Sequence, residues 1–384
     1  MHNKLITLAV AAAIATPVAV LADVKIGGFA QVEIAREESV STTGTISTES
    51  RLTTTEDNSR GRFWITADED LAYGMKGLAH FEFRVDTTGV CESEAGGSTC
   101  GVTGGTTTTD DTGANVREKW VGLKAPWGTV KAGSVRSPYK YAGGVLLDTF
   151  VTTNLEARGT GGMSGGVFGH NNFVDNAVSY NSPAMASVTI NVTYSFDDVP
   201  EGAFAAGAAT STTGGGNAST ADDGDYMASV EWAQKFSDSM AVMVAIAHAN
   251  NQDNNPALTS GVKINDFTAD KIAAKLDFLK YFTVKAQVES LEDDVNVIDD
   301  DVWFVGFDTK LGAWLLALQV GKTEQGGTGT NFDTDYLALG GIFNFSKSFI
   351  VFTGWRSTDA DLTSTGTPVS TEFDVYTVGA RKSF

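Results

Sequence analysis

Apolar and polar residues alternate with a period of two along most of this chain, and this pattern constrains the fold more than any other feature. Residues 283–289, for example, place Val284, Ala286 and Val288 on one face and only polar side chains on the other. Such alternation is typical of a β-strand with one apolar and one wet face. The apolar faces need a cover, which is either lipid or a second sheet.

Sixteen such strands can be placed along the chain. No stretch has 18 consecutive apolar residues beyond the N-terminus, so no spanning helix is expected. The chain after the N-terminal segment allows about 23 residues for each strand and its connection, enough for tilted membrane strands. Long polar loops alternate with short turns, and an even strand number places both termini on the periplasmic side. The predicted strands begin near residues 23, 59, 72, 114, 128, 172, 186, 225, 239, 266, 280, 301, 312, 334, 348 and 372.

These observations predict an all-β chain, a 16-stranded antiparallel transmembrane β-barrel over residues 23–384. A soluble β-sandwich or propeller is the alternative, but it would not need the regular difference between long and short connections. Residues 1–22 carry Lys4, an apolar run and small or aliphatic residues before the end of the segment. They are predicted to be a secretory signal peptide cleaved after Ala22. A membrane anchor is disfavoured because the apolar run is short and a processing site follows it.

One connection is unusually long. A Gly-, Ser- and Thr-rich run over about residues 137–171 lies between the strands predicted at 129–136 and 172–180. Loops of this length are uncommon in compact domains. In a wide barrel such a loop can fold into the lumen and narrow it, so we expect it to be a constriction loop.

The charge and the cysteines exclude several classes of function. A formal net charge of −20 disfavours nucleic acid as a partner. Cys91 and Cys100 stand in one Gly/Thr-rich loop, which in an exported protein predicts a local disulfide rather than a metal pair. No histidine stands in a metal-ligand spacing, and no Ser/His/acid spacing indicates catalysis. We therefore expect no enzyme activity, no metal and no cofactor.

Four motifs, taken in order along the chain, resemble the general porins of Gram-negative outer membranes, which are trimeric sixteen-stranded diffusion channels. This resemblance implies a multi-pass outer-membrane barrel that passes small hydrophilic solutes and ions by passive diffusion. It also implies a homotrimer in contact with outer-membrane lipid and lipopolysaccharide. The motifs are 62–71 with 74–77, 117–123 with 127–130, 175–183 and 378–384.

The resemblance also implies a pore constriction between acids on the long loop and arginines on the barrel wall. Asp148 and Glu156 match the loop acids, and Arg62 and Arg117 match two of the wall arginines. The chain departs from the family at Gly133-Ser134, where Gly-Arg is frequent. It departs again at Phe173-Val174, where an arginine is expected. The predicted arginine cluster is therefore thinned.

Alternation predicts the rest of the lumen wall. If Phe63, Ile65, Met75, Phe81 and Trp120 face lipid, the alternate positions face the lumen and form one basic wall. Opposed by the loop acids, this wall would create a transverse field that filters solutes by charge. The wall positions are Arg60, Arg62, Lys76, Arg84, Arg117, Lys119 and Lys131.

The last strand alternates and ends on Phe384, whose ring is predicted to lie in an aromatic girdle at the membrane surface. Two other functions stay open at this point. One is a pore selective for a single solute class, which would need a line of aromatic residues or a denser charge ladder. The other is a structural or adhesive barrel with a plugged lumen, which a conductance measurement would distinguish.

Overall fold

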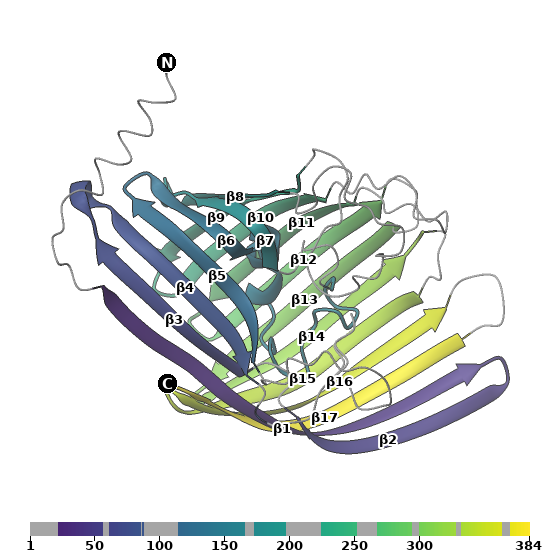
Figure 1. Cartoon of the computed structure of the whole chain (residues 1–384). Coiled ribbons are helices and arrows are strands. Elements are labelled where there is room, and N and C mark those ends of the chain that lie inside the picture. The colour runs from purple at the N-terminus through teal and green to yellow at the C-terminus, as the bar shows by residue number, and fades with distance from the viewer. Residues whose placement is uncertain are drawn as a thin grey trace, which may run out of the picture.

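The barrel seen in Figure 1 is described in a computed structural model. The described residues are 22–56, 61–85, 87, 114–165, 173–196, 224–251, 267–293, 299–327, 332–362 and 369–384. The predicted leader (except Ala22), Arg60, Cys91, Cys100 and residues 166–171 of the predicted constriction loop lie outside them. Among the described residues, no helix combines the length and the apolar character needed to cross a membrane.

Almost all of the regular structure is β-strand. The strands of the first half are β1 Asp23–Thr43, β2 Ile46–Glu56, β3 Gly61–Asp70, β4 Lys76–Val85, β5 Ala114–Ala125, β6 Gly128–Arg136, β7 Phe173–Asn181 and β8 Val188–Ser195. Those of the second half are β9 Tyr226–Ser237, β10 Met240–Asn251, β11 Phe267–Phe278, β12 Phe282–Asp293, β13 Asp299–Leu311, β14 Trp314–Gln325, β15 Phe332–Ser346, β16 Phe349–Leu362 and β17 Val369–Ser383. The short helices are η1 Ala72–Gly74, α2 Pro138–Tyr141 and η2 Gly144–Leu146.

The sheet closes into a barrel of sixteen strands, because β2 and β3 share one place in it. The first part of β1 pairs with β3, and its later part, Glu33–Thr43, pairs with β2. The other edge of β1 pairs with β17 from Phe29 opposite Ser383 to Thr43 opposite Val369. The remaining strands pair antiparallel with their neighbours in sequence. The predicted fold class is therefore confirmed.

The sequence pattern misses β2, because no strand is predicted between those that begin near residues 23 and 59. Its residues Ile46–Glu56 are Ser- and Thr-rich, and most of those with a described side chain are exposed. Because neither face of this hairpin is covered, no apolar alternation marks it in the sequence. Strand β2 continues the barrel wall along β1, beyond the part of β1 that pairs with β3.

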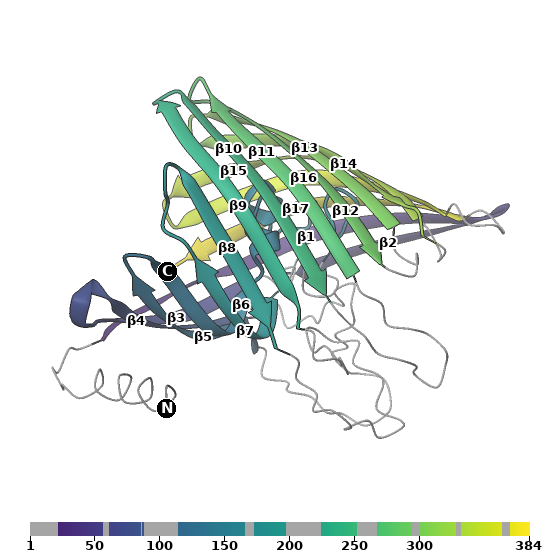
Figure 2. The ribbon, with the colours of Figure 1, turned by 90° about the horizontal axis from the view of Figure 1, so that it is seen from above.

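The two ends of the barrel differ. Short connections such as those between β9 and β10 or β13 and β14 lie at the end where β1 begins and β17 ends, which we call the turn end. Figure 2 shows several of these turns on the left and the tip of the β1–β2 hairpin on the right. The long connections lie at the opposite end, the loop end. The segment that joins β6 to β7 starts and ends there.

The two faces of the wall differ as alternation predicts. Along β12, Lys285, Gln287 and Glu289 are buried on the inner face, whereas Val288 on the outer face is 53% exposed. Exposed apolar residues cover the outer face of most strands, and a surface of this extent needs lipid. Closure through β1–β17 and β1–β3 pairs both edges of the wall, apart from the outer edge of β2, which pairs only with β1. Pairing satisfies the backbone hydrogen bonds that lipid cannot.

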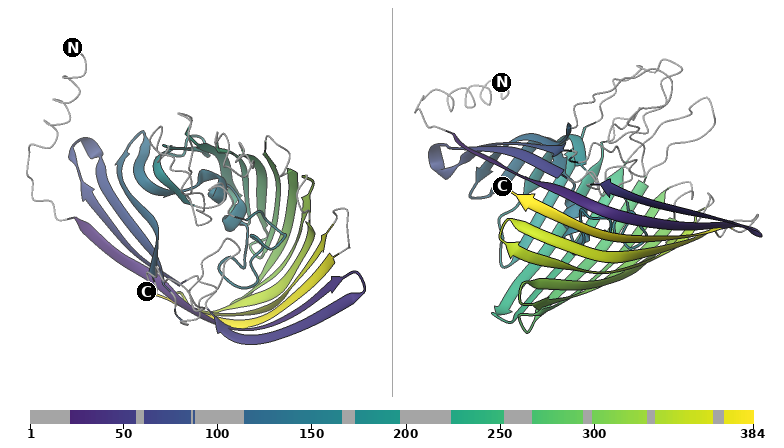
Figure 3. Two further views of the ribbon diagram at one scale, coloured as in Figure 1. Left: turned by 45° about the vertical axis from the view of Figure 1, so that its right-hand side comes forward. Right: turned by 90° about the horizontal axis from the view of Figure 1, so that it is seen from below.

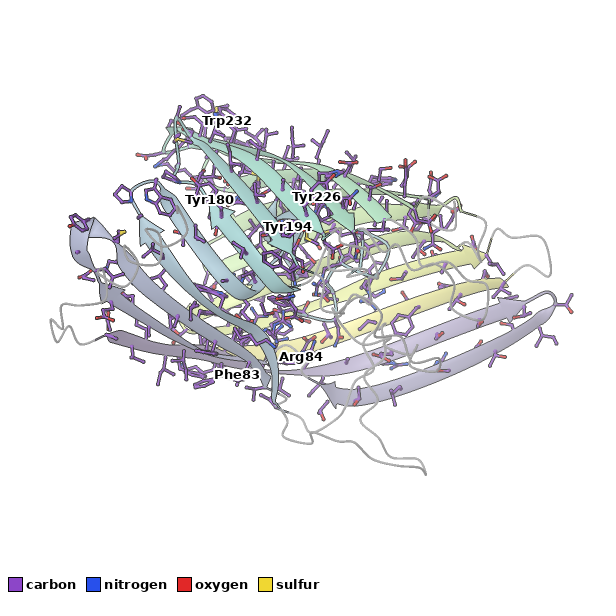
Figure 4. The ribbon with its side chains drawn as sticks, turned by 45° about the horizontal axis from the view of Figure 1, so that its top comes forward. Phe83, Arg84, Tyr180, Tyr194, Tyr226 and Trp232 are labelled. Carbon is purple, nitrogen blue, oxygen red and sulfur yellow. The ribbon has the colours of Figure 1, made fainter. Side chains whose placement is uncertain are left out.

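Aromatic rings gather on the outer face at the turn end. Phe282 stacks between Phe278 and Phe307, with ring centroids 5.4 and 5.9 Å away. Figure 4 shows Tyr180 and Trp232 near this end. The exposed ring of Phe384 lies over Gly28, and the two backbones exchange hydrogen bonds of 3.0 and 3.2 Å. These positions suit a girdle at the membrane surface.

The outer face gives a test of lipid contact. Val288→Arg should lower the free energy of unfolding by about 2–4 kcal/mol, the cost of an arginine near the middle of a barrel's lipid face. Urea unfolding in lipid vesicles measures this, and Val288→Ile serves as the uncharged control. A loss no larger than that of the isoleucine variant would contradict a lipid-facing position.

Candidate functional site

The segment Ser137–Gly165 contacts the inner face of the barrel and runs within the ring of strands (Figure 3). Its large apolar side chains Tyr139, Leu147, Phe150 and Leu155 are 0% exposed. They belong to one apolar cluster with small inner-face residues such as Ala273, Ala317 and Ala338. Alanine on the inner face leaves room for the segment's large side chains. The segment is thus packed against one side of the wall.

Glu289 on β12 holds both ends of this segment. Its carboxylate accepts hydrogen bonds from the Tyr139 hydroxyl at 3.0 Å, and from the backbone N–H and the hydroxyl of Ser164 at 3.1 and 2.6 Å. Lys271 on β11 brings its Nζ to 3.9 Å from the same carboxylate and 4.0 Å from the centre of the Tyr139 ring. A buried ion pair of this kind is costly to break by removing one partner.

Two further anchors fix the middle of the segment. The Thr149 hydroxyl donates to the carboxylate of Asp308 on β13, at 2.8 Å, and Lys285 lies 2.8 Å from the same carboxylate. The Tyr336 hydroxyl on β15 donates to the backbone carbonyl of Leu155 at 2.6 Å. The segment is therefore held to several strands rather than to one.

The segment also reaches the seam between β1 and β17. The backbone and side-chain N–H groups of Asn154 donate to Glu33 on β1, each at 3.2 Å. Gln31 on β1 donates to the carbonyl of Thr152, and Arg381 on β17 donates to the hydroxyl of the same threonine and to Gln31. This group joins the first strand, the last strand and the middle of the chain.

Asp148 and Glu156 shape the segment itself. Asp148 is 4% exposed, and its carboxylate accepts from the backbone N–H groups of Phe150 at 2.9 Å and Ala157 at 2.8 Å. Glu156 accepts from the N–H of Thr152 at 3.0 Å. Burial raises the pKa of Asp148 to about 6, and the nearby charge of Glu156 adds to the shift. Both carboxylates hold turns of the segment, and their predicted part in a transverse field stays a prediction.

Charged side chains form a network on the opposite part of the wall, over β3–β6. One oxygen of Glu82 lies 3.5 Å from Arg62 Nε and 3.1 Å from Arg117 Nε. Its other oxygen lies 3.3 Å from an Arg136 guanidinium nitrogen, and Arg136 Nε donates to Glu118. We call these five residues the wall cluster. It brings Arg62 and Arg117 together through an acid that the sequence analysis did not select.

A β-bulge sets which side chains of β5 enter the lumen. Glu82 pairs with Glu118 and Phe83 pairs with Val116, so Arg117 is the extra residue between two pairs. Arg117 and Glu118 both join the wall cluster, and the alternation after them is reversed.

The reversal corrects two expectations. Lys119 pairs with the outward Phe81 and is exposed, so it lies on the outer face and not on the lumen wall. Trp120 pairs with His80 and lies on the inner face, although the alternation predicted that it faces lipid. A one-residue insertion moves every following side chain to the other face, and the sequence pattern does not announce it.

Aromatic rings support the cations of this region. The Arg117 guanidinium lies 4.6 Å from the centre of the Phe173 ring, and Lys140 Nζ lies 4.5 Å from it. The Arg136 guanidinium lies 5.0 Å from the centre of the Tyr141 ring. Such contacts stabilise partly buried cations. Phe173, at a position where the family pattern suggested an arginine, thus sits between two cations.

The remaining predicted wall residues keep the expected face. Arg84 pairs with Arg62, and Figure 4 labels Arg84 beside Phe83, the residue before it on β4. Lys131 pairs with Gly122 and lies 4.8 Å from the centre of the inward Trp120 ring. Lys76, near the turn end, lies 3.2 Å from Asp68 and 2.9 Å from Asp70. What these side chains do for permeation is taken up as a proposal below.

The sequence analysis missed three members of the wall cluster. Glu82 lies between Phe81 and Phe83, so alternation alone could have found it. Glu118 could not be found without the bulge. Arg136 stands two residues after Ser134 and supplies a guanidinium to a cluster that the sequence analysis predicted to be thinned.

A closed barrel with an apolar outer face and a charged, partly filled lumen defines an outer-membrane channel for passive diffusion. The chain belongs to the Gram-negative porin family, whose family model matches residues 9–363. A search of curated protein sequences finds no match.

Solved porin structures have a similar fold. An anion-selective porin from Comamonas acidovorans has 15% sequence identity and a TM-score of 0.62, with 95% of this chain and 100% of that chain covered. OmpT of Vibrio cholerae has 15% identity and a TM-score of 0.59, with 95% and 100% covered. OmpF of Salmonella typhi, in complex with daunomycin, has 14% identity and a TM-score of 0.59, with 94% and 97% covered. At these identities the likeness shows the fold.

The Glu289 anchor gives a test of how the segment is held. Glu289→Gln leaves the Lys271 charge buried without its partner, which typically costs about 3–5 kcal/mol. The segment should then be cleaved by trypsin at Lys140 or Arg158 in folded protein, detected by mass spectrometry. Adding Lys271→Met removes the unpaired charge and should restore most of the protection, and Glu69→Gln is the control. Equal cleavage of the single and double variants would contradict the ion pair as an anchor.

Proposed function

We propose that the loop over residues 137–171 constricts the lumen and that solutes pass between it and the wall cluster. The support is the set of hydrogen bonds that fix Ser137–Gly165 to β1 and β12–β15. These bonds hold the segment to one side of the wall, so the free passage runs along the other side. Leu146, 54% exposed, belongs to the segment's uncovered surface, and Arg136, with a 43% exposed side chain, belongs to the wall.

We propose further that the passage prefers anions. Around the wall cluster, six cationic side chains accompany two carboxylates, those of Glu82 and Glu118. In a narrow lumen with low-dielectric walls, excess charge of one sign raises the local concentration of the opposite ion. The acidic charge of the whole chain acts from greater distances, where salt screens it. The six cations are Arg62, Arg84, Arg117, Lys131, Arg136 and Lys140.

Two lysines on neighbouring strands test this preference. Lys131→Gln removes an inner-face charge, and at about 10 Å from an ion in water that charge contributes roughly 0.4 kcal/mol. This is about twofold for each ion, in opposite directions for anions and cations, and so about fourfold in the permeability ratio. Lys119→Gln is the matched control, because it removes a charge from the outer face. Reversal potentials across a potassium chloride gradient in planar bilayers should move toward cations for Lys131→Gln alone.

Two results would contradict the proposal. Cation preference in the wild-type channel would show that the acids dominate the passage. An equal shift for both lysine variants would show that the inner-face position has no special effect on ion preference.

The double variant Asp148→Asn with Glu156→Gln distinguishes the contribution of the loop from that of the wall, because these carboxylates hold the segment's turns. It should alter the size of the conductance more than its ion preference.

We propose that the working protein is a homotrimer, surrounded by outer-membrane lipid and lipopolysaccharide, that passes small hydrophilic solutes. The exposed apolar outer face supports the lipid contact, and the family supports the assembly. Cross-linking and native mass analysis in mild detergent test it, and a monomer alone in both would contradict it. Transport without catalysis or a bound cofactor is our proposal for the activity as well.

We also propose that residues 1–22 are removed on export and that Cys91 and Cys100 form a local disulfide. Their support lies in the sequence, since 1–21 and both cysteines are outside the described residues. Mass spectrometry of the mature protein tests both points. An N-terminus other than Asp23 would contradict the first. Alkylation of both thiols without prior reduction would contradict the second.

A further inference from the structure

Three potential metal ligands meet on the inner wall of β4 and β5. A ring nitrogen of His80 and one carboxylate oxygen from each of Glu82 and Glu118 all lie within 4.8 Å of one another. The three positions are brought together by the register, since Glu82 pairs with Glu118 and His80 is two residues from Glu82 on the same face. Sequence spacing gives no sign of this group, because Glu118 enters it only through the bulge at Arg117.

Two of these ligands are held in place by neighbours. The hydroxyl of Thr66 lies 2.9 Å from His80 Nδ1, and the imidazole stacks on the ring of Trp120 with centroids 5.4 Å apart. Trp120 Nε1 also donates to Glu118 at 3.1 Å. Metal-binding histidines usually have one nitrogen held in this way while the other binds the ion. The other nitrogen of His80, Nε2, is buried and has no hydrogen-bond partner.

Arg136 occupies the position between the two carboxylates. It contacts one oxygen of Glu82 and one of Glu118. The second oxygen of Glu82 is held separately by Arg62 and Arg117, and the second oxygen of Glu118 is held by Trp120. Moving Arg136 therefore frees one oxygen on each acid and leaves the rest of the cluster bound. Its half-exposed side chain has room to move into the lumen.

We propose that His80, Glu82 and Glu118 form a binding site for a zinc-like divalent transition metal ion, which competes with Arg136 for the two carboxylates. One imidazole and two carboxylates are suitable ligands for Zn²⁺, and a site with three protein ligands would leave a fourth position for water. Arg62 and Arg117 lower the affinity by repulsion, so the ion binds reversibly. Binding adds two positive charges to the wall and releases the Arg136 guanidinium into the passage, which strengthens its preference for anions.

The test is zinc titration of the folded full-length channel, followed by calorimetry at pH 7. His80→Gln and Glu118→Gln should each weaken zinc binding by at least about tenfold, because each removes a ligand. Arg136→Gln should tighten binding by at least about tenfold, because it removes the competing charge. His248→Gln is the control, since His248 bonds Asp270 on the strands β10 and β11, away from the cluster. Heat-modified mobility and single-channel steps confirm that each variant folds.

Two further measurements separate the site from adventitious binding. Co²⁺ added to Arg136→Gln should give the visible absorption of a coordinated ion, and the additional change His80→Gln should abolish it. Micromolar zinc should shift the wild-type reversal potential toward anions, and His80→Gln should remove that shift. The proposal is overturned if His80→Gln binds zinc as the wild type does, if Arg136→Gln binds no more tightly, or if neither the wild type nor Arg136→Gln binds zinc.

Discussion

The requirement that no backbone polar group meet lipid unpaired governs this structure. An open sheet edge at membrane depth would expose a row of N–H and C=O groups that lipid cannot satisfy. The pairing of β1 with β17 removes that edge. It also fixes which face of every strand is turned to lipid, because residues opposite each other in the ladder share a face. The lumen, the segment packed in it and the wall cluster all follow from this closure.

Inside the barrel, polar side chains are buried among protein atoms instead of water, so they need hydrogen-bond partners from the protein. Three carboxylates serve as shared acceptors: Glu289, Glu33 and Asp308 each bind groups from both the wall and the segment. Networks that share acceptors in this way hold one arrangement rigidly. On the other side of the lumen, around the wall cluster, cationic side chains outnumber carboxylates and the wall there carries excess positive charge. Packing of the segment and the ion filtering that we propose thus use opposite parts of one wall.

The period of two predicts most strands and the orientation of most side chains. The number and length of these strands then predict closure into a barrel. The period of two alone places Val288 on the outer face of β12 and Glu289 on its inner face. Prediction fails where a local event breaks the parity. The bulge at Arg117 turns Lys119 outward and brings Trp120 inward, and no residue type marks it beforehand. The hairpin strand β2 is missed for a related reason, since a strand wet on both faces has no apolar period.

The seam contacts of the segment also bear on the order of assembly. Asn154 and Thr152 bond to Glu33, Gln31 and Arg381, which are separated from them by 121 to 229 positions in the chain. Contacts of such long range carry a large loop-closure cost and form late. The segment contacts the first and the last strand at once, so its middle reaches its final position only when the two ends of the wall meet.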